Sequence, residues 1–479
     1  MGSLSAASLL AKAGKKVLIL EQNYLSGGCT SSYWRKGFVF ETGATTLVGL
    51  DKNQPLAYLV EQTGINLDTR ILELPMQVRL KNGEIINRFQ AIEDWIIEAE
   101  RVFGKKNQRK FWEKCFRLSQ FVWDTSLRQT TFPITSFSDL FRAIKSVNID
   151  QLRYAGYSFV SIKSLLQKHD LLKNETFVDF INAQLLITAQ NTIEEVNSLF
   201  GAAALCYTNY TNHYVNGGLI NLVNPFIAYI EKSGGAIHLR ETVIKINPIF
   251  NKNKPSKTNY LVETTKSTYT CEYLISGIPI NNTIDLYPNI APKYKNSILK
   301  SAQLNSAFQM GIGFRKSKDF STIHHQIHLK SPLPQLNAKT IFVSLSHPKD
   351  TSRTDDPNMM VASVSTHWAD PERKLDISKE ALEQCVIDSL IDAQILHRQD
   401  IIYTHSSSPT AWAKWTMRAY GFVGGYPQYM KIKPWQLLDA RLDGYKAYQV
   451  GDSVYPGQGI PGVTLGGIIA FQKLKNDWL

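Results

Sequence analysis

Residues 1–21 constrain the fold more than any other part of the chain. Residues 2–14 place small and apolar side chains at helical spacing, and Gly14 suits the position just after a helix end. Residues 17–20 form an apolar run typical of a buried parallel strand, and Glu21 follows it. A helix, such a strand and an acid at the strand end make the second half of a dinucleotide-binding unit, whose carboxylate binds ribose hydroxyls. We therefore predict an α/β fold with a Rossmann-like domain.

The first half of that unit is missing from the sequence. A complete unit begins with a strand and the first glycines of G-x-G-x-x-G. Here Met1 falls inside the phosphate turn, Gly2 follows it, and Ser3 stands where the third glycine would be. Ser is small enough for close packing of the helix on the strand. We expect the true start to lie upstream of Met1, and we expect Gly2 and Ser3 to face a pyrophosphate.

Residues 451–463, near the C-terminus, have the composition of a ligand-binding turn. They follow a short apolar segment that predicts a strand, and they precede a helical pattern at residues 465–474. The start of a helix attracts negative charge, and the glycines allow a flat ligand to approach the backbone closely. Asp452 lies where the strand ends and can accept hydrogen bonds from sugar-type hydroxyls. The alternative is an ordinary glycine-rich loop.

Composition indicates a globular protein. The 479 residues are 43% hydrophobic and 20% charged, and they are enough for two domains. The five cysteines are scattered, which indicates reduced thiols and a cytoplasmic location. The net charge of +12 fits either a solvated basic surface or peripheral attachment to the anionic inner face of a membrane. No motif for nucleic-acid binding is present, so we expect no such partner.

A second pattern follows Glu21. It reads Gly27-Gly28-x-Thr30, and then Gly37-Phe38-x-Phe40-Glu41-x-Gly43-Ala44. At this distance from an acidic strand end, the pattern resembles the second flavin motif of the FAD-dependent phytoene desaturase, carotenoid isomerase and amine oxidase group. With the Gly-Asp-Ser turn at residues 451–453, the resemblance spans nearly the whole chain. Two strand patterns at residues 341–347 and 361–368 resemble the carotenoid 3,4-desaturases in particular.

The resemblance implies FAD as the cofactor. It places the backbone of Val243 at the adenine and Gly277 beside the cofactor, while the N–H groups near Gly462 and Val463 stabilise negative charge on the reduced flavin ring. Together with the residues taken from local patterns, the expected cofactor-binding set is Gly2, Ser3, Glu21, Gly27, Gly28, Thr30, Gly43, Ala44, Val243, Gly277, Gly451, Asp452, Gly459, Gly462 and Val463.

The chain is expected to alternate between two domains. The FAD-binding domain takes residues 1–75, 211–290 and 406–479. An α+β substrate-binding domain is inserted as residues 76–210, mostly helical, and 291–405, a sheet plus a helix. A polar hairpin loop is expected at residues 248–257. The many aromatic residues between 104 and 210 are either plain core or the wall of a tunnel for a long apolar substrate.

The resemblance implies an FAD-dependent oxidoreductase that acts on a long apolar polyene. The leading hypothesis is a carotenoid desaturase using hydride transfer to flavin. A redox-neutral carotenoid cis–trans isomerase, a polyene saturase and an amine oxidase use the same scaffold and stay open. A flavin-free lipid-binding protein or an inactive truncated relative is an alternative of another class. Whether the chain as given holds FAD stays open at the level of the sequence.

No catalytic side chain stands out in the sequence. The candidates are His367, Trp412 and Tyr426, each with a structural role as the alternative. The histidines at 324, 325 and 328 lack a carboxylate or cysteine at ligand spacing, so we expect no metal site.

Overall fold

The computed structural model describes residues 1–146, 152–250 and 258–479. Most of the polar hairpin loop expected at residues 248–257 lies outside these described residues. None of the helices within them is long and apolar enough to cross a membrane.

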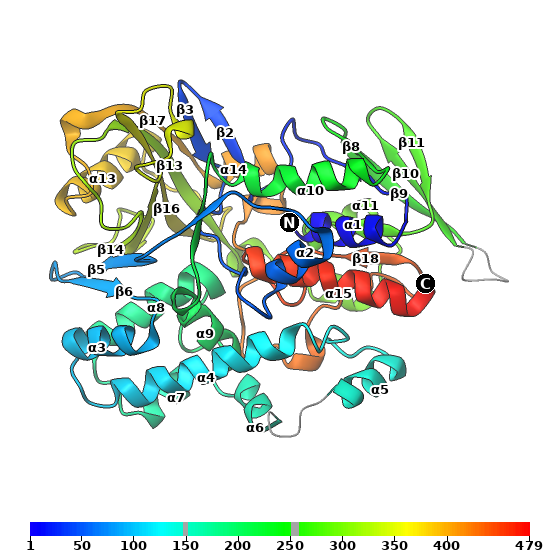
Figure 1. The fold of residues 1–479 in the computed structure, drawn as a ribbon, viewed down its shortest axis with the longest axis horizontal. Helices are drawn as coiled ribbons and strands as arrows, with labels where there is room; N and C mark the ends of the chain where they lie inside the picture. Colours follow the sequence, from blue (N-terminus) through cyan, green and yellow to red (C-terminus); the bar gives the residue numbers. More distant parts are fainter. Residues whose placement is uncertain (147–151, 251–257) are drawn as a thin grey trace.

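Two parallel strand pairs form the part of the fold that holds the N-terminus (Figure 1). Strand β1 (Leu18–Leu20) pairs with β8 (Ala236–His238), and β12 (Leu274–Ser276) pairs with β18 (Ala447–Gln449). Helix α1 (Gly2–Lys12) packs against α15 (Ile460–Trp478) and α10 (Ile220–Lys232). Segments from both ends and the middle of the sequence therefore build one α/β unit, as predicted.

Strand β1 is parallel, as expected, but it is not buried. Leu18 is 38% exposed, and the two residues after it are half-buried. In the described part of the chain, β8 is the one strand hydrogen-bonded to β1, so the other edge of β1 has no strand beside it. The prediction of burial was wrong because an apolar run shows only that a strand is hydrophobic. It does not show whether other strands flank it on both edges.

A seven-stranded sheet forms the other half of the molecule. Its order is β17 (Ile401–Ser407), β13 (Asn305–Arg315), β16 (Met359–Ala369), β15 (Thr340–Leu345), β14 (His324–His328), β5 (Met76–Arg79) and β6 (Ile85–Arg88). All neighbours are antiparallel except β14 and β5. Helix α13 (Lys379–Asp392) packs its apolar residues on the sheet. The sheet thus joins a hairpin from residues 76–88 to strands from 305–407.

A layer of helices covers the region below this sheet in Figure 1. Its aromatic core contains Trp95, Trp112, Phe177 and Phe180, all fully buried. Helices make up most of the described residues between 92 and 210. The helices are α3 (Ile92–Phe103), α4 (Gln108–Ser126), α5 (Phe137–Ser146), α6 (Leu152–Ala155), α7 (Ile162–Lys168), α8 (Glu175–Ala189) and α9 (Ser198–Leu205).

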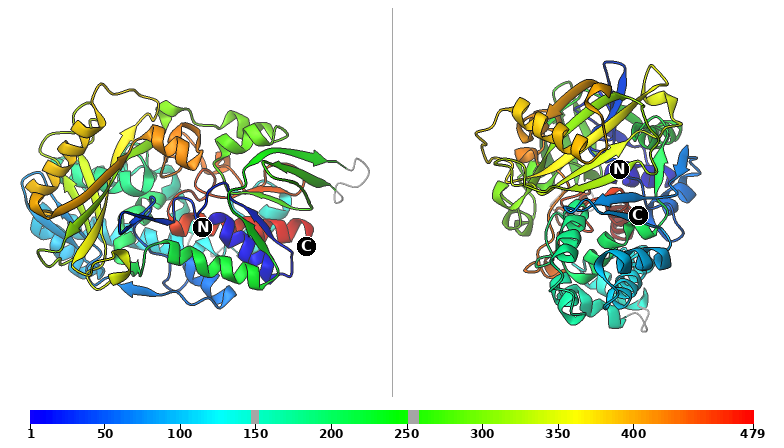
Figure 2. Two further views of the ribbon diagram at one scale, coloured as in Figure 1. Left: turned by 90° about the horizontal axis from the view of Figure 1, so that it is seen from above. Right: turned by 90° about the vertical axis from the view of Figure 1, so that its left-hand side faces the viewer.

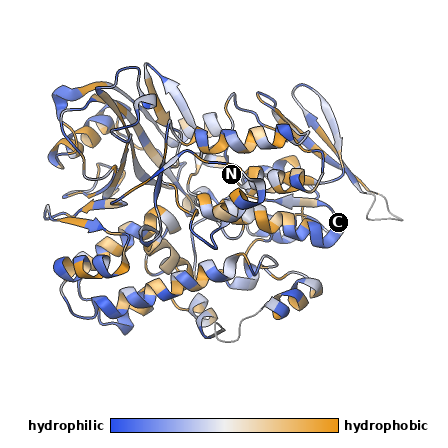
Figure 3. Cartoon of the chain, in the orientation of Figure 1, coloured by the Kyte–Doolittle hydropathy of each residue, from blue (hydrophilic) through white to orange (hydrophobic). Residues whose placement is uncertain are grey.

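The remaining elements connect these layers. Figure 2 shows the yellow strands of the large sheet at one end of the molecule and α1 and α15 toward the other. In Figure 3 the part of α15 beside α1 is hydrophobic, while its C-terminal end is hydrophilic. The connecting elements are β2 (Ser32–Arg35), β3 (Phe38–Glu41), α2 (Pro55–Thr63), β4 (Thr69–Ile71), β7 (His213–Val215), β9 (Val243–Ile249), β10 (Asn259–Thr264), β11 (Thr268–Cys271), α11 (Ile280–Leu286), α12 (Pro292–Asn296) and α14 (Pro409–Thr416).

Candidate functional site

A cavity of ≈ 1430 Å³ lies between the α/β unit and the sheet-and-helix half. Its walls come from α4, α8, α9, β15, β16 and the loops at residues 423–438 and 452–459, and most of the lining surface is apolar. Pockets for one drug-sized ligand measure roughly 300–1,000 Å³. The cavity is therefore large enough for a dinucleotide-sized group and a second, apolar ligand.

The start of α15 forms one end of the cavity. Gly459, Gly462 and Val463 line it, and the helix has neither a side-chain cap nor an acidic residue in its first turn. Gly457 and Gly459 have φ values of 112° and 81°, which other residues rarely adopt. An uncapped helix N-terminus directs backbone N–H groups and positive potential at a ligand. This end of the cavity suits an anionic or electron-rich group.

The start of α1 lies directly against the turn that precedes α15. A Cβ atom on Gly2 would lie 3.1 Å from the backbone N of Gly451 and 3.2 Å from the carbonyl oxygen of Val463. A Cβ atom on Gly277 would lie 1.7 Å from Ser3 Oγ. The structure thus brings together five of the predicted cofactor residues from three distant segments. Of these five residues, Val463 lines the cavity, whereas Gly2, Ser3, Gly277 and Gly451 do not.

Glu21 is hydrogen-bonded to the segment that leads into Val243. The carboxylate of Glu21 accepts a hydrogen bond from the Asn23 N–H at 2.9 Å, and the Glu21 carbonyl accepts one from the Glu241 N–H at 2.9 Å. Val243 begins β9 two residues later. Burial raises the pKa of the Glu21 carboxyl. A ribose hydroxyl donating to this carboxylate would stabilise its charged form.

The loop at residues 27–44 forms part of the cavity wall. Thr30, Gly43 and Ala44 line the cavity, and Gly27 and Gly28 lie in the turn before them. Gly27 has a φ of 99°, and a Cβ atom there would lie 2.5 Å from the carbonyl oxygen of Thr30. Only glycine fits this turn, so the double glycine of the sequence has a structural reason.

Asp452 is held by an arginine that the sequence analysis did not identify. Arg418 Nη2 donates to both carboxylate oxygens of Asp452, at 3.0 and 2.9 Å, and its Nε donates to the Phe422 carbonyl at 2.8 Å. Burial lowers the pKa of the Arg418 guanidinium, but the Asp452 carboxylate raises it, and the net shift is upward. Arg418 belongs to no motif and lies 34 residues before Asp452. Only the folded chain reveals the pair.

The three catalytic candidates all line the cavity, but two of them have structural partners. His367 Nε2 lies 2.9 Å from the Leu186 carbonyl oxygen, and burial lowers the pKa of its ring. The Tyr426 hydroxyl donates to Asn281 and accepts from the Leu299 N–H, and burial raises its pKa. Neither group is placed as a free acid or base near neutral pH.

Trp412 differs from these two. Its side chain is 5% exposed, and its indole N–H has no hydrogen-bond partner among the described residues. A Cβ atom on Gly43 would lie 3.5 Å from the Trp412 ring. A buried donor without a partner costs free energy unless a ligand accepts from it. Trp412 is therefore the candidate best placed to contact a bound group.

The polar side chains at the distal end of the cavity are already paired. Gln326 accepts from Gln184 at 2.5 Å and donates to the Ala183 carbonyl at 3.0 Å. Behind them, the buried Arg88 donates to Gln184 at 2.6 Å and stacks on Trp95. Burial lowers the pKa of Arg88 to about 10. Because the Gln326 amide already bonds to Gln184 and to the Ala183 carbonyl, the distal wall suits an apolar ligand.

These observations fit FAD. The uncapped start of α15 can stabilise an anionic group, the glycines at α1 allow close packing of the α/β unit, and the indole N–H of Trp412 is without a partner in the described residues. In the described parts of the chain, no group of three or more potential ligands is arranged to hold a metal ion.

A family model described as flavin containing amine oxidoreductase matches residues 4–473. Two curated relatives differ in how much of the chain they match. All-trans-retinol 13,14-reductase of Danio rerio is 27% identical over 51% of this chain, and this chain spans 41% of that protein's length. Prolycopene isomerase 2 of an Oncidium hybrid cultivar is 21% identical over 100% of this chain and 82% of its own length.

Solved structures share the fold. Putrescine oxidase bound to putrescine superposes with a TM-score of 0.62 at 14% sequence identity, over 99% of this chain and 96% of that one.

Proposed function

Because the chain belongs to the flavin containing amine oxidoreductase family, we propose that it uses FAD to transform a long apolar polyene of the carotenoid type. It is an FAD-dependent enzyme, as predicted, so the flavin-free alternative is not retained. The cavity carries the proposal, because it extends from the start of α15 to a largely apolar wall on which Gln326 is already paired with Gln184. Carotenoid-type relatives along the whole chain support the choice of substrate.

Bound FAD would supply the two-electron chemistry by accepting or returning a hydride. The start of α15 would stabilise negative charge that develops on the ring system. Glu21 and the Asp452–Arg418 pair would bind and orient the hydroxyl-bearing parts of the cofactor. The apolar walls would exclude water and hold the reacting carbon atoms in place, and positioning of this kind contributes most of the effect.

Among the reactions on this scaffold, we favour redox-neutral cis–trans isomerisation. The supporting observation is that the relatives matching the whole chain are named prolycopene isomerases. The sequence pattern by itself favoured desaturation, which stays the second candidate. Saturation is supported by a relative that matches only half of the chain.

Amine oxidation has less support from the cavity. Among the described lining residues, Asp452 is the one acidic side chain, and both of its oxygens accept from Arg418. A cationic amine would therefore find no free carboxylate to pair with.

Mass and geometry of the product distinguish these reactions. Flavin-loaded enzyme is incubated anaerobically with a cis-configured carotene. The products are separated by chromatography, and their molecular masses are measured by mass spectrometry. A changed isomer at unchanged mass is the expected result. A product that has lost two hydrogens when an electron acceptor is added would indicate desaturation in place of isomerisation. A product that has gained two hydrogens would indicate saturation. No change in any carotene, together with peroxide release from amines, would overturn the proposal.

A further inference from the structure

The cavity reaches the surface between four segments of the chain. Its lining includes residues from 131–146, 152–168, 287–303 and 427–438. Several lining residues are exposed, among them Ile134, Phe159, Asn296 and Lys431. This opening lies at the end of the cavity wall formed by α5, α6 and α12.

Helix α5 turns its apolar stripe toward solvent at this opening. The side chains of Phe137, Ile144 and Phe141 are 93%, 62% and 61% exposed. Together with Leu140 they recur at the spacing of one helix face. The opposite face is anchored, because Asp139 forms an ion pair with Arg441 at 2.7 Å. An amphipathic helix normally buries its apolar stripe. Here the buried ion pair holds the stripe outward.

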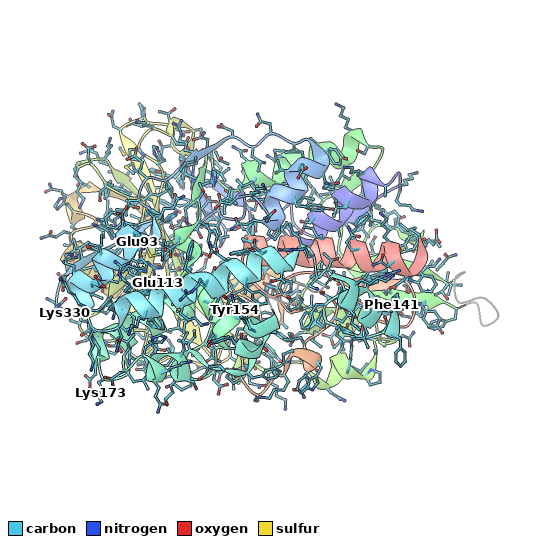
Figure 4. The ribbon with its side chains drawn as sticks, turned by 60° about the horizontal axis from the view of Figure 1, so that its bottom comes forward. Glu93, Glu113, Phe141, Tyr154, Lys173 and Lys330 are labelled. Carbon is cyan, nitrogen blue, oxygen red and sulfur yellow. The ribbon has the colours of Figure 1, made fainter. Side chains whose placement is uncertain are left out.

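Further exposed aromatic rings extend this surface. Phe159 is 49% exposed and Trp435 is 69% exposed, and their ring centroids lie 5.9 Å apart. Figure 4 brings this side of the molecule forward and labels Phe141 on α5 and Tyr154 on α6. Large aromatic side chains clustered in the open are uncommon on a monomer and mark an interaction site.

The same four segments are strongly basic. The described residues of 131–146, 152–168, 287–303 and 427–438 contain ten lysines and arginines but one acid, Asp139, which is buried and paired. On α5 itself, the Lys145 ammonium lies 4.4 Å from the centre of the Phe141 ring. Basic side chains flanking exposed aromatics are typical of surfaces that bind the interface of an anionic bilayer.

We propose that this surface, here called the docking surface and formed by the described residues of these four segments, binds an anionic lipid bilayer and aligns the cavity opening with it. The inference rests on the proposed function, because a substrate stored in the bilayer would pass from the lipid into the cavity without crossing water. The exposed rings insert among the acyl chains, and the basic side chains bind the lipid headgroups.

Vesicle binding tests the proposal without any substrate. The flavin-loaded protein is sedimented with vesicles of phosphatidylcholine, with and without phosphatidylglycerol. We expect binding that increases with the anionic lipid and weakens with added salt. The apolar variant should bind at least about tenfold more weakly. It combines Phe137→Gln, Phe141→Gln and Ile144→Gln. A control variant with equally exposed apolar residues elsewhere should bind like wild type; it combines Ile71→Gln, Ile97→Gln and Ile402→Gln.

A second pair of variants tests the charges. Reversing three exposed lysines of the docking surface should remove the preference for phosphatidylglycerol; the variant combines Lys145→Glu, Lys295→Glu and Lys431→Glu. Reversing three exposed lysines outside it should leave most of that preference; the control combines Lys105→Glu, Lys173→Glu and Lys330→Glu. The flavin spectrum and melting temperature of each variant report whether it is folded.

Three outcomes would overturn the proposal. One is wild-type protein that does not bind anionic vesicles, and another is an apolar variant that binds as wild type does. The third is an apolar variant that changes from dimer to monomer in light scattering, since the surface would then join two copies of the chain. A failure of the proposed function is distinguishable, because it appears as inactivity toward polyenes in detergent and in vesicles while vesicle binding persists.

Discussion

Arg418 donates to both carboxylate oxygens of Asp452 within 3.0 Å, and the pair lies at the wall of the cavity. The aspartate belongs to the glycine-rich turn before α15, whereas the arginine follows α14. The guanidinium therefore fixes the orientation of the one acidic side chain that lines the cavity in the described residues.

Removing this arginine should weaken flavin binding. Arg418→Gln leaves the half-buried Asp452 carboxylate without its charged partner, and loss of a charge-assisted hydrogen bond costs about 1.5–3 kcal/mol, or about tenfold to a hundredfold in affinity. The visible flavin absorbance of the purified protein and titration of the apoprotein with FAD measure the effect. Arg398→Gln, which breaks an exposed pair with Asp388, is the control. Equal flavin content in both variants would show that Arg418 has no such role.

Gly277 should tolerate no side chain while Ser3 faces it. The added methyl group of Gly277→Ala would overlap Ser3 Oγ, and relief of such overlap typically costs about 1–3 kcal/mol of stability. Ser3→Gly should restore part of the loss in the double variant, as a double-mutant cycle of thermal or urea unfolding would measure. The control Gly444→Ala meets no atom within 4 Å. Independent effects of the two substitutions would contradict the contact.

The buried histidines of β14 should make the protein sensitive to acid. Burial lowers the pKa of His324 to about 3 and those of His325 and His328 to about 4, against about 6.5 in an unfolded chain. Between these values the unfolded state binds more protons, so stability is complete above about pH 6.5 and falls as the pH is lowered. Each histidine contributes a slope of up to about 1.4 kcal/mol per pH unit.

Urea unfolding between pH 7.5 and 4.5 measures that slope. His328 has an Nε2 atom without a partner in the described residues, so His328→Leu should reduce the slope by up to one histidine's share. His397→Gln, at an exposed position, should leave it unchanged. A His328→Leu variant with the wild-type slope would argue against titration of this strand.

Filling the apolar part of the cavity should impair turnover of long substrates and spare the cofactor. Ala203 on α9 lines the cavity, so Ala203→Phe places a ring in the path of a polyene. We expect kcat/KM to fall at least about tenfold for the long substrate, because misplacement of the reacting atoms is costly. The flavin spectrum should stay that of wild type. Ala411→Phe, on the exposed side of α14, is the control, and equal loss in both variants would contradict the assignment of the wall.

Local patterns in the sequence predicted several elements correctly. The helix at the N-terminus and the strands β15 and β16 follow from residue spacing, because side-chain periodicity reflects which face is buried. The double glycine at residues 27 and 28 and the turn at 451–463 follow from backbone conformations that glycine adopts readily. The assignment of individual residues to FAD and the domain boundaries stay predictions, as does the cytoplasmic location.

Tertiary packing decided which residues are exposed and which buried charges are paired, and local sequence patterns do not predict either property. Leu18 is exposed although its sequence predicts a buried strand, since burial depends on which strands flank it. Phe137 and Phe141 face solvent because Asp139, on the other side of the same helix, is held by an arginine some 300 residues away. Arg418 likewise meets Asp452 only in the fold. Short-range spacing in the sequence was enough to predict several helices and strands, and the resemblance of its motifs to known flavin motifs implied the cofactor class and the family. The structure decided the partners of buried charges and the exposed surfaces, because these depend on contacts between distant segments.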